Sequence, residues 1–132
     1  MNKKQLFKEL KTQFDITKTK QKDYDFDLQI DDTLYKILVL KSSSNTQITI
    51  NSVKIWEIAR GTKNGIRFKK SVSNLYDITS FSQYENKIVF LTNPPYRVLR
   101  YLNESDIVIV QPNELVNGIR IINSINEFND LK

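Results

Sequence analysis

Basic side chains that can bind phosphate groups collect in one short segment of the chain. The segment runs from residue 60 to residue 70, and it contains no acidic residue. Its basic members are Arg60, Lys63, Arg67, Lys69 and Lys70. Arginine and lysine at this density neutralise nucleic-acid phosphates and release the counterions that the phosphates hold. The segment therefore predicts a contact with the backbone of DNA or RNA.

A second stretch interleaves basic and aromatic side chains. Residues 96–101 read YRVLRY, and Asn93-Pro94-Pro95 before them is typical of a helix start, because proline is tolerated in the first helical turn. On a helix, Arg97 shares one face with Arg100 or Tyr101, and that face can lie along a phosphate backbone. Aromatic side chains beside basic ones can also stack on unpaired bases. The alternative interpretation is that the two tyrosines flank the core.

The residue inventory excludes several kinds of chemistry. The chain has no cysteine and no histidine, which excludes thiolate catalysis, Ser–His–Asp hydrolysis and the usual zinc sites. The glycine-rich phosphate-binding motifs are absent from the sequence. The net charge of +5 favours an acidic partner, although the same charge also serves solubility alone.

Length and composition predict one domain over residues 1–132. The chain has the usual length of a domain, and a hydrophobic content of 39% suffices for a core. No apolar run is long enough for a signal peptide or a membrane span. We therefore expect a cytoplasmic protein without a membrane partner. The sequence leaves the oligomeric state open.

Hydrophobic periodicity predicts the elements of the first half. Residues 1–14 have apolar side chains at spacings of three and four, which indicates an amphipathic helix. Strict alternation over residues 23–30 predicts a half-buried strand, and the continuous apolar run over 34–41 predicts an internal strand. These two strands should form an antiparallel hairpin. Residues 47–51 predict a third strand.

In the second half, helices are expected to alternate with strands. Ser52 as N-cap and Gly61 as terminator predict a helix over 53–60, which a buried Trp56 anchors to the sheet. Strands are predicted over 87–91, 106–110 and, at a sheet edge, 119–125, with a second helix over 94–102. Helices between apolar strands imply parallel crossovers. The expected fold class is α/β, a mixed β-sheet flanked by helices on both faces.

This order, αβββαβαβ, resembles the core of the PD-(D/E)XK nuclease superfamily, which includes restriction endonucleases and Holliday-junction resolvases. The resemblance covers roughly residues 1 to 110 and depends on topology and on the first hairpin. In that family an aspartate ends the second core strand, and a Glu/Gln-x-Lys triplet lies on the third. The two carboxylates hold Mg²⁺, and the lysine orients the attacking water. The resemblance thus implies a restriction-endonuclease-like core.

Carried onto this chain, the resemblance makes Asp27 and Lys41 candidate catalytic residues, with Asp25 as an alternative to Asp27. The triplet position reads Val39-Leu40-Lys41, so an apolar side chain replaces the second carboxylate. Some members of the superfamily move that carboxylate to the following helix, where Glu57 is the candidate. Asp27 and Glu57 would then be the metal ligands. Asp27 alone would bind Mg²⁺ weakly, because this ion gives up its hydration shell reluctantly.

Several functions follow from these observations. We favour a nucleic-acid-binding protein with a degenerate restriction-endonuclease-like fold, little or no catalysis and no cofactor. The alternatives are an active Mg²⁺-dependent DNA endonuclease, a protein-interaction or inhibitor module of a mobile element, and a small histidine-free ribonuclease toxin. The residues expected to contact DNA or RNA are Arg60, Lys63, Arg67, Lys69, Lys70, Arg97 and Arg100.

Overall fold

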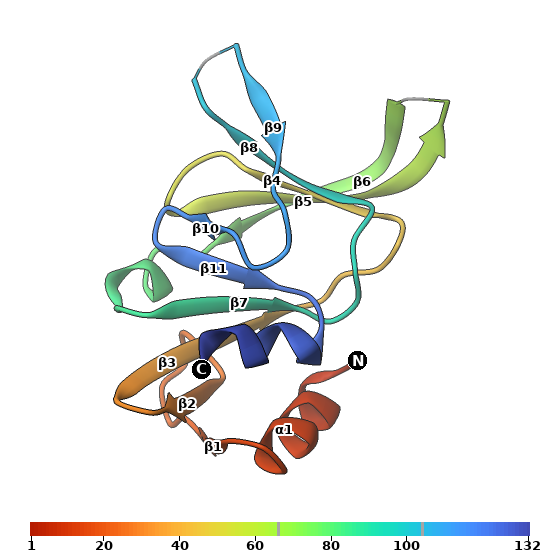
Figure 1. Cartoon of the computed structure of the whole chain (residues 1–132). Coiled ribbons are helices and arrows are strands. Elements are labelled where there is room, and N and C mark those ends of the chain that lie inside the picture. The colour runs from red at the N-terminus through yellow and green to blue at the C-terminus, as the bar shows by residue number, and fades with distance from the viewer. Residues whose placement is uncertain (66, 104) are drawn as a thin grey trace.

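Two mixed β-sheets stack on each other, and helices cover the far side of one of them (Figure 1). The computed structural model describes residues 1–65, 67–103 and 105–132. Within these ranges the elements are α1 (Lys3–Lys11), β1 (Asp15–Lys18), β2 (Phe26–Ile30), β3 (Thr33–Leu40), β4 (Thr46–Ile50), β5 (Ile55–Asn64), β6 (Arg67–Asp77), the 3₁₀-helix η1 (Phe81–Gln83), β7 (Lys87–Leu91), β8 (Arg97–Tyr101), β9 (Ile107–Ile109), β10 (Leu115–Val116), β11 (Ile119–Ile122) and the 3₁₀-helix η2 (Ile125–Leu131).

The six-stranded sheet has the order β1-β2-β3-β7-β11-β10. The predicted hairpin is confirmed, because β2 pairs antiparallel with β3. The continuous apolar run is an internal strand as predicted, since β3 also pairs, in parallel, with β7. The strand predicted over residues 119–125 is confirmed as β11 over Ile119–Ile122, but its predicted position at the sheet edge was wrong. A tight turn at Asn117 and Gly118, both at positive φ, brings β10 back along β11 and covers it.

The predicted N-terminal helix is confirmed as α1, and it packs on the outer side of the six-stranded sheet. A capping box starts it, with the Asn2 side chain accepting from the Gln5 N–H at 2.9 Å and the Gln5 side chain accepting from the Asn2 N–H at 3.0 Å. Leu6 and Leu10 are fully buried against this sheet together with Phe128 of η2. Of the helices described, none is long and apolar enough to cross a membrane.

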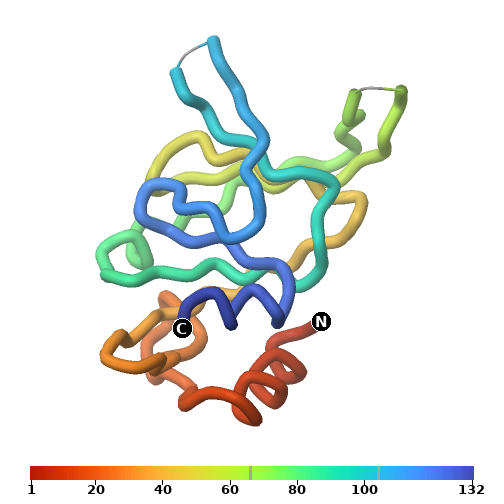
Figure 2. The backbone as a smooth tube through the Cα atoms, in the orientation of Figure 1, coloured from red at the N-terminus to blue at the C-terminus, as the bar shows by residue number. Residues whose placement is uncertain are grey.

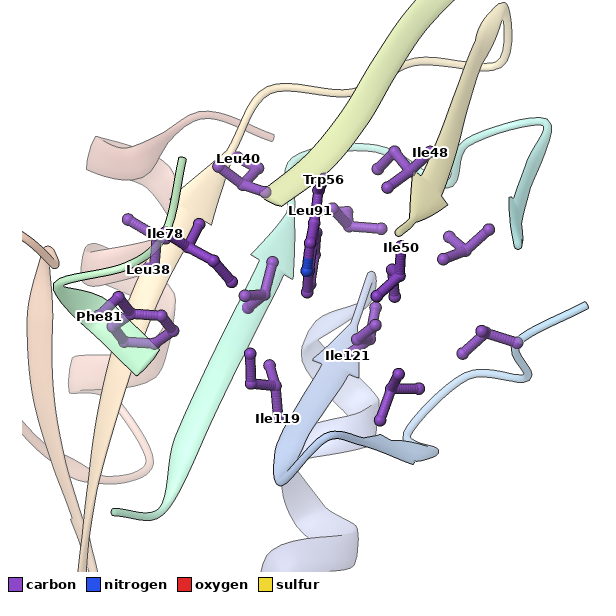
Figure 3. Packing of buried hydrophobic residues seen from close by; sticks show 14 of the residues in the cluster. Leu38, Leu40, Ile48, Ile50, Trp56, Ile78, Phe81, Leu91, Ile119 and Ile121 are labelled. Atoms are coloured by element: carbon purple, nitrogen blue, oxygen red, sulfur yellow. The ribbon is translucent and has the colours of Figure 1, made fainter. Parts of the chain in front are cut away.

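The second core lies between the two sheets. Trp56 of the five-stranded sheet is buried there, as predicted, among Ile48 and Ile50 of its own sheet and Leu40 and Leu91 of the other (Figure 3). Alternate residues of each strand contribute, as the pleat requires. The five-stranded sheet, of order β6-β5-β4-β8-β9, is thus anchored on one face only.

The helix predicted over residues 53–60 was wrong, because residues 55–60 belong to strand β5. The capping signal was real, but it serves a turn: the Ser52 hydroxyl accepts from the N–H groups of Lys54 and Ile55, at 3.2 and 3.0 Å. Gly61 does not end a helix. It lies inside β5 at a register shift, a β-bulge, opposite β6.

The helix predicted over residues 94–102 was also wrong, because Arg97–Tyr101 is strand β8. Pairing with β4 on one side and β9 on the other outweighs the local helix-start signal. Helices therefore flank one sheet on its outer side, and the second sheet takes the place of the other helical layer (Figure 1). The class is α/β with mixed sheets, but the element order differs from αβββαβαβ.

Candidate nucleic-acid interface

The five-stranded sheet presents its second face away from the core. In β5, Trp56 points into the core, so alternation directs Glu57, Ala59 and Lys63 to the other side. In β8, Val98 points into the core, and alternation directs Arg97 to the same side as Glu57. We call this side the outer face.

The strand register arranges the outer face in rows. One row runs through Leu75 of β6, Glu57, Thr49 of β4, Leu99 of β8 and Ile109 of β9. The next row runs through Ser73, Ala59, Gln47 and Arg97. Thr49, Ala59 and Gln47 are buried although they are on this face. These three residues form the low floor of the outer face.

Two aromatic and two basic side chains meet at one end of this face. The rings of Phe68 and Tyr96 stack with centroids 5.4 Å apart and an angle of 17° between their planes. The Lys63 ammonium lies 5.7 Å and the Arg97 guanidinium 5.2 Å from the centre of the Tyr96 ring. We call these four residues the aromatic–basic cluster. Such contacts leave both cations able to meet an anion while the rings hold them in place.

Three segments distant in sequence build the cluster. Lys63 and Phe68 are cross-strand partners near the end of the β5–β6 hairpin, which projects from the stacked sheets (Figure 2). Tyr96 precedes β8, and its N–H donates to the Thr46 carbonyl at 2.8 Å. The Arg97 Nε donates to the Gln47 Oε1 at 2.6 Å, which fixes the guanidinium on the floor of the outer face.

The remaining basic residues of the 60–70 segment, which spans the undescribed Ile66, divide between two faces. Arg60, Arg67 and Lys69 are exposed, and alternation places them on the side of the hairpin opposite Lys63. Lys70 lies on the outer face, where it forms an ion pair with Glu57. A single flat surface therefore does not contain all five basic side chains, but a ligand that wraps the hairpin can contact both sides.

Arg97 and Arg100 do not share a face, so that part of the prediction was wrong. Residues three positions apart lie on the same face of a helix. On a strand they lie on opposite faces, because side chains alternate with a period of two. Arg100 points inward beside Glu114, with 3.4 Å between Arg100 Nε and Glu114 Oε2. That contact lacks hydrogen-bond geometry, and both atoms are buried. Of the two arginines, only Arg97 belongs to the outer face.

The candidate catalytic aspartate is engaged within the six-stranded sheet. Asp27 Oδ1 accepts from the Tyr24 hydroxyl at 2.9 Å and from the Lys36 ammonium at 3.3 Å. Lys36 is its direct cross-strand partner on β3. The Lys36 ammonium also lies over the Tyr24 and Tyr84 rings, at 5.1 and 5.3 Å. This lysine, which sequence reasoning overlooked, occupies the position beside Asp27 that the hypothesis gave to Lys41.

The structure does not bring Asp27, Lys41 and Glu57 together. Lys36 faces Asp27, and Leu40 follows four residues later, about 13 Å along an extended strand, with Lys41 beyond it. Glu57 lies on the other sheet, paired with Lys70. The alternative, Asp25, accepts from the Val39 N–H at 2.7 Å and pairs with Lys3 at 2.9 Å. Across the described ranges, no three acidic side chains converge as metal ligands.

The Lys36 contacts predict a pH-dependent contribution to stability. Burial lowers the pKa of the Lys36 ammonium, but its hydrogen bonds to Tyr24 and Asp27 and the Asp27 charge outweigh burial and raise the pKa above the ordinary 10.5. A raised lysine pKa means that the stabilisation is complete below the unfolded-state pKa and is lost as the pH rises through the folded-state pKa.

We therefore expect Lys36→Met to lower the free energy of unfolding by about 1 kcal/mol near neutral pH, since the charged hydrogen bonds are lost and the apolar stem is kept. The difference from the parent should shrink above about pH 10.5. Urea unfolding at about pH 8 and about pH 11 measures it. Lys41→Met, at an exposed position, is the control. A difference that stays constant with pH would contradict this assignment.

Two members of the outer face escaped sequence reasoning. Phe68 lies inside the basic segment, and the pattern Lys63–Phe68 across a hairpin becomes visible only when residues 55–77 are assigned to two strands. Gln47 was assigned to a strand, but its bond to Arg97 joins residues 50 positions apart.

No family model, curated protein or solved structure matches this chain.

Proposed function

We propose that this protein binds nucleic acid through the outer face of the five-stranded sheet and the β5–β6 hairpin. The aromatic–basic cluster carries the proposal. In it, Lys63 and Arg97 lie over the Tyr96 ring, and Phe68 stacks on the same ring. Cations fixed beside half-exposed aromatic rings suit a ligand that offers phosphates and flat bases side by side.

The charges around the cluster support a polyanionic ligand. Arg60, Arg67 and Lys69 are exposed on the same hairpin, and the chain as a whole carries a net charge of +5. Lys70 is partly neutralised by Glu57, so it should contribute less than its neighbours. Arg100 is directed toward Glu114 and should contribute least. The contact with phosphates is therefore expected from Arg60, Lys63, Arg67, Lys69 and Arg97.

Cleavage by a restriction-endonuclease-like site is the less favoured function. It requires a carboxylate pair and a lysine around one metal ion, as the PD-(D/E)XK resemblance implies. Asp27 lies on β2, Lys41 follows β3 and Glu57 lies on β5, and both carboxylates are paired with lysines other than Lys41. The restriction-endonuclease-like core remains a prediction, and binding by the aromatic–basic cluster requires no metal.

Affinity for nucleic acid should fall as the salt concentration rises. Each phosphate contact contributes about one unit to the slope of log affinity against log salt. We expect the double variant Arg67→Gln/Lys69→Gln to reduce that slope by up to about two units. Fluorescence anisotropy with labelled DNA and RNA oligonucleotides over a range of KCl concentrations measures it.

The control is Lys4→Gln/Lys8→Gln, which removes the same charge from the exposed side of α1. This variant should keep the parental slope. An equal loss in both double variants would mean that only net charge matters, and no binding by the parent at low salt would refute the proposed function. Incubation of the same DNA with Mg²⁺ tests cleavage separately.

A further inference from the structure

We infer that the outer face binds unpaired bases, so that the ligand is single-stranded DNA or RNA and not a duplex. This inference rests on the proposed function and specifies the class of its ligand. It starts from an apolar surface next to the aromatic–basic cluster. Phosphate contacts alone do not account for that surface, because charged phosphate groups bind basic and polar side chains and not apolar ones.

The apolar surface lies on the β8–β9 hairpin. Leu99 and Ile109 are cross-strand partners on the outer face, and so are Tyr101 and Ile107. Tyr101, Ile107 and Ile109 are 44%, 48% and 56% exposed, and Leu99 is half-buried. We call these four residues the apolar patch. Exposed apolar side chains that adjoin one another are typical of a binding surface.

The apolar patch continues directly from the aromatic–basic cluster. Arg97, Leu99 and Tyr101 are alternate residues of β8, so their side chains follow one another on one face at intervals of about 6.6 Å. The low floor of Gln47, Thr49 and Ala59 lies beside them. A flexible chain can therefore place phosphates on Lys63 and Arg97 and lay successive bases on Phe68 and then along β8.

A duplex would use little of this surface. Its bases are already stacked on one another, so aromatic and apolar side chains gain contact only with bases that are unpaired. A protein partner could cover the apolar patch, but the cations of Lys63 and Arg97 beside it favour a polyanion. The same cations disfavour a second copy of this chain, which would bring like charges together.

The experiment compares single strands with a duplex at one salt concentration. Fluorescence anisotropy is recorded with three labelled ligands of equal length. They are oligothymidylate, oligouridylate and the duplex of the oligothymidylate with oligodeoxyadenylate. Phe68→Leu keeps an apolar side chain but removes the ring, and it should weaken single-strand binding about 10-fold. Ile109→Ser should weaken it about 3-fold or more. In each variant, the loss of affinity for the duplex should be smaller than the loss of affinity for single strands.

The matched control is Leu115→Ser. Leu115 is 56% exposed, like Ile109, but it lies on β10 of the other sheet. The Leu115→Ser variant should bind single strands with the parental affinity. Thermal unfolding of each variant tests whether the fold is kept. Duplex binding as tight as single-strand binding, or equal losses for both ligands in Phe68→Leu and Ile109→Ser, would overturn the inference and leave nucleic-acid binding standing. No binding to any of the three oligonucleotides would overturn both.

Discussion

Trp56→Ala is expected to lower the free energy of unfolding by about 3–5 kcal/mol, the usual cost of removing a large aromatic side chain from a core. Trp56 is 1% exposed and lies between the two sheets, near Leu40, Leu91 and Ile50 (Figure 3). Alanine would leave a cavity that rigid strands on both sides cannot close. Urea denaturation followed by far-ultraviolet circular dichroism measures the loss.

Trp56→Phe separates the ring from the indole N–H. Within the described residues, the Trp56 Nε1 is buried without a hydrogen-bond partner, which is itself a cost to stability. Phenylalanine removes this unpaired donor and keeps most of the apolar contact, so its loss should be less than half of the alanine loss. Near-parental stability of Trp56→Ala would show that Trp56 does not hold the sheets together.

The first hairpin was predictable because its signals are local and agree with each other. Alternation over residues 23–30 predicts a strand with one solvent-exposed face, and the apolar run over 34–41 predicts a strand that is buried on both faces. The structure provides the first environment in β2, and it provides the second over residues 37–40 of β3, between α1 and η2 on one side and the second sheet on the other, whereas Leu34 is exposed. No contact far along the chain was needed to choose strand over helix there.

Residues 53–60 and 94–102 were not predictable in the same way, since their local signals fit both a helix and a strand. Ser52 can cap a helix or close a turn, and both uses offer its oxygen to the next backbone N–H groups. What decided the outcome is pairing with β4, which both β5 and β8 flank. The β4–β5 pairing is a hairpin between neighbouring segments, but β8 pairs with β4 across about 50 residues, and a short window of sequence does not contain that contact.

The candidate site shows the same division. Composition located the basic segment at residues 60–70, because a run of cations without acids remains a charged region in any secondary structure. Which cations lie on the same face depends on whether the segment is a helix or a strand, because side chains repeat every 3.6 residues on a helix and every two on a strand. A helix would have joined Arg97 to Arg100, whereas the strand joins Arg97 to Lys63 through Tyr96 and sends Arg100 inward.

Gly61→Ala is expected to lower the free energy of unfolding by about 3 kcal/mol, at the upper end of the usual cost of overpacking. A Cβ at Gly61 would overlap the Lys69 carbonyl oxygen and lie 2.9 Å from the Lys70 Cα. Both obstacles are backbone atoms of β6, so no side chain can rotate away to make room. The bulge between Arg60 and Gly61 fixes how the β5–β6 hairpin twists, and the methyl group would force the strands apart there.

The same substitution should also impair the proposed nucleic-acid binding, because Lys63 and Phe68 lie just beyond the bulge. Gly118→Ala is the control. Gly118 has a φ of +77°, but a Cβ there meets nothing within 4 Å, so alanine costs only about 1–2 kcal/mol of backbone strain and leaves the outer face untouched. Urea unfolding and anisotropy with single-stranded oligonucleotides are measured on both variants. A Gly61→Ala protein that unfolds and binds like Gly118→Ala would show that the close approach of β5 and β6 does not shape the site.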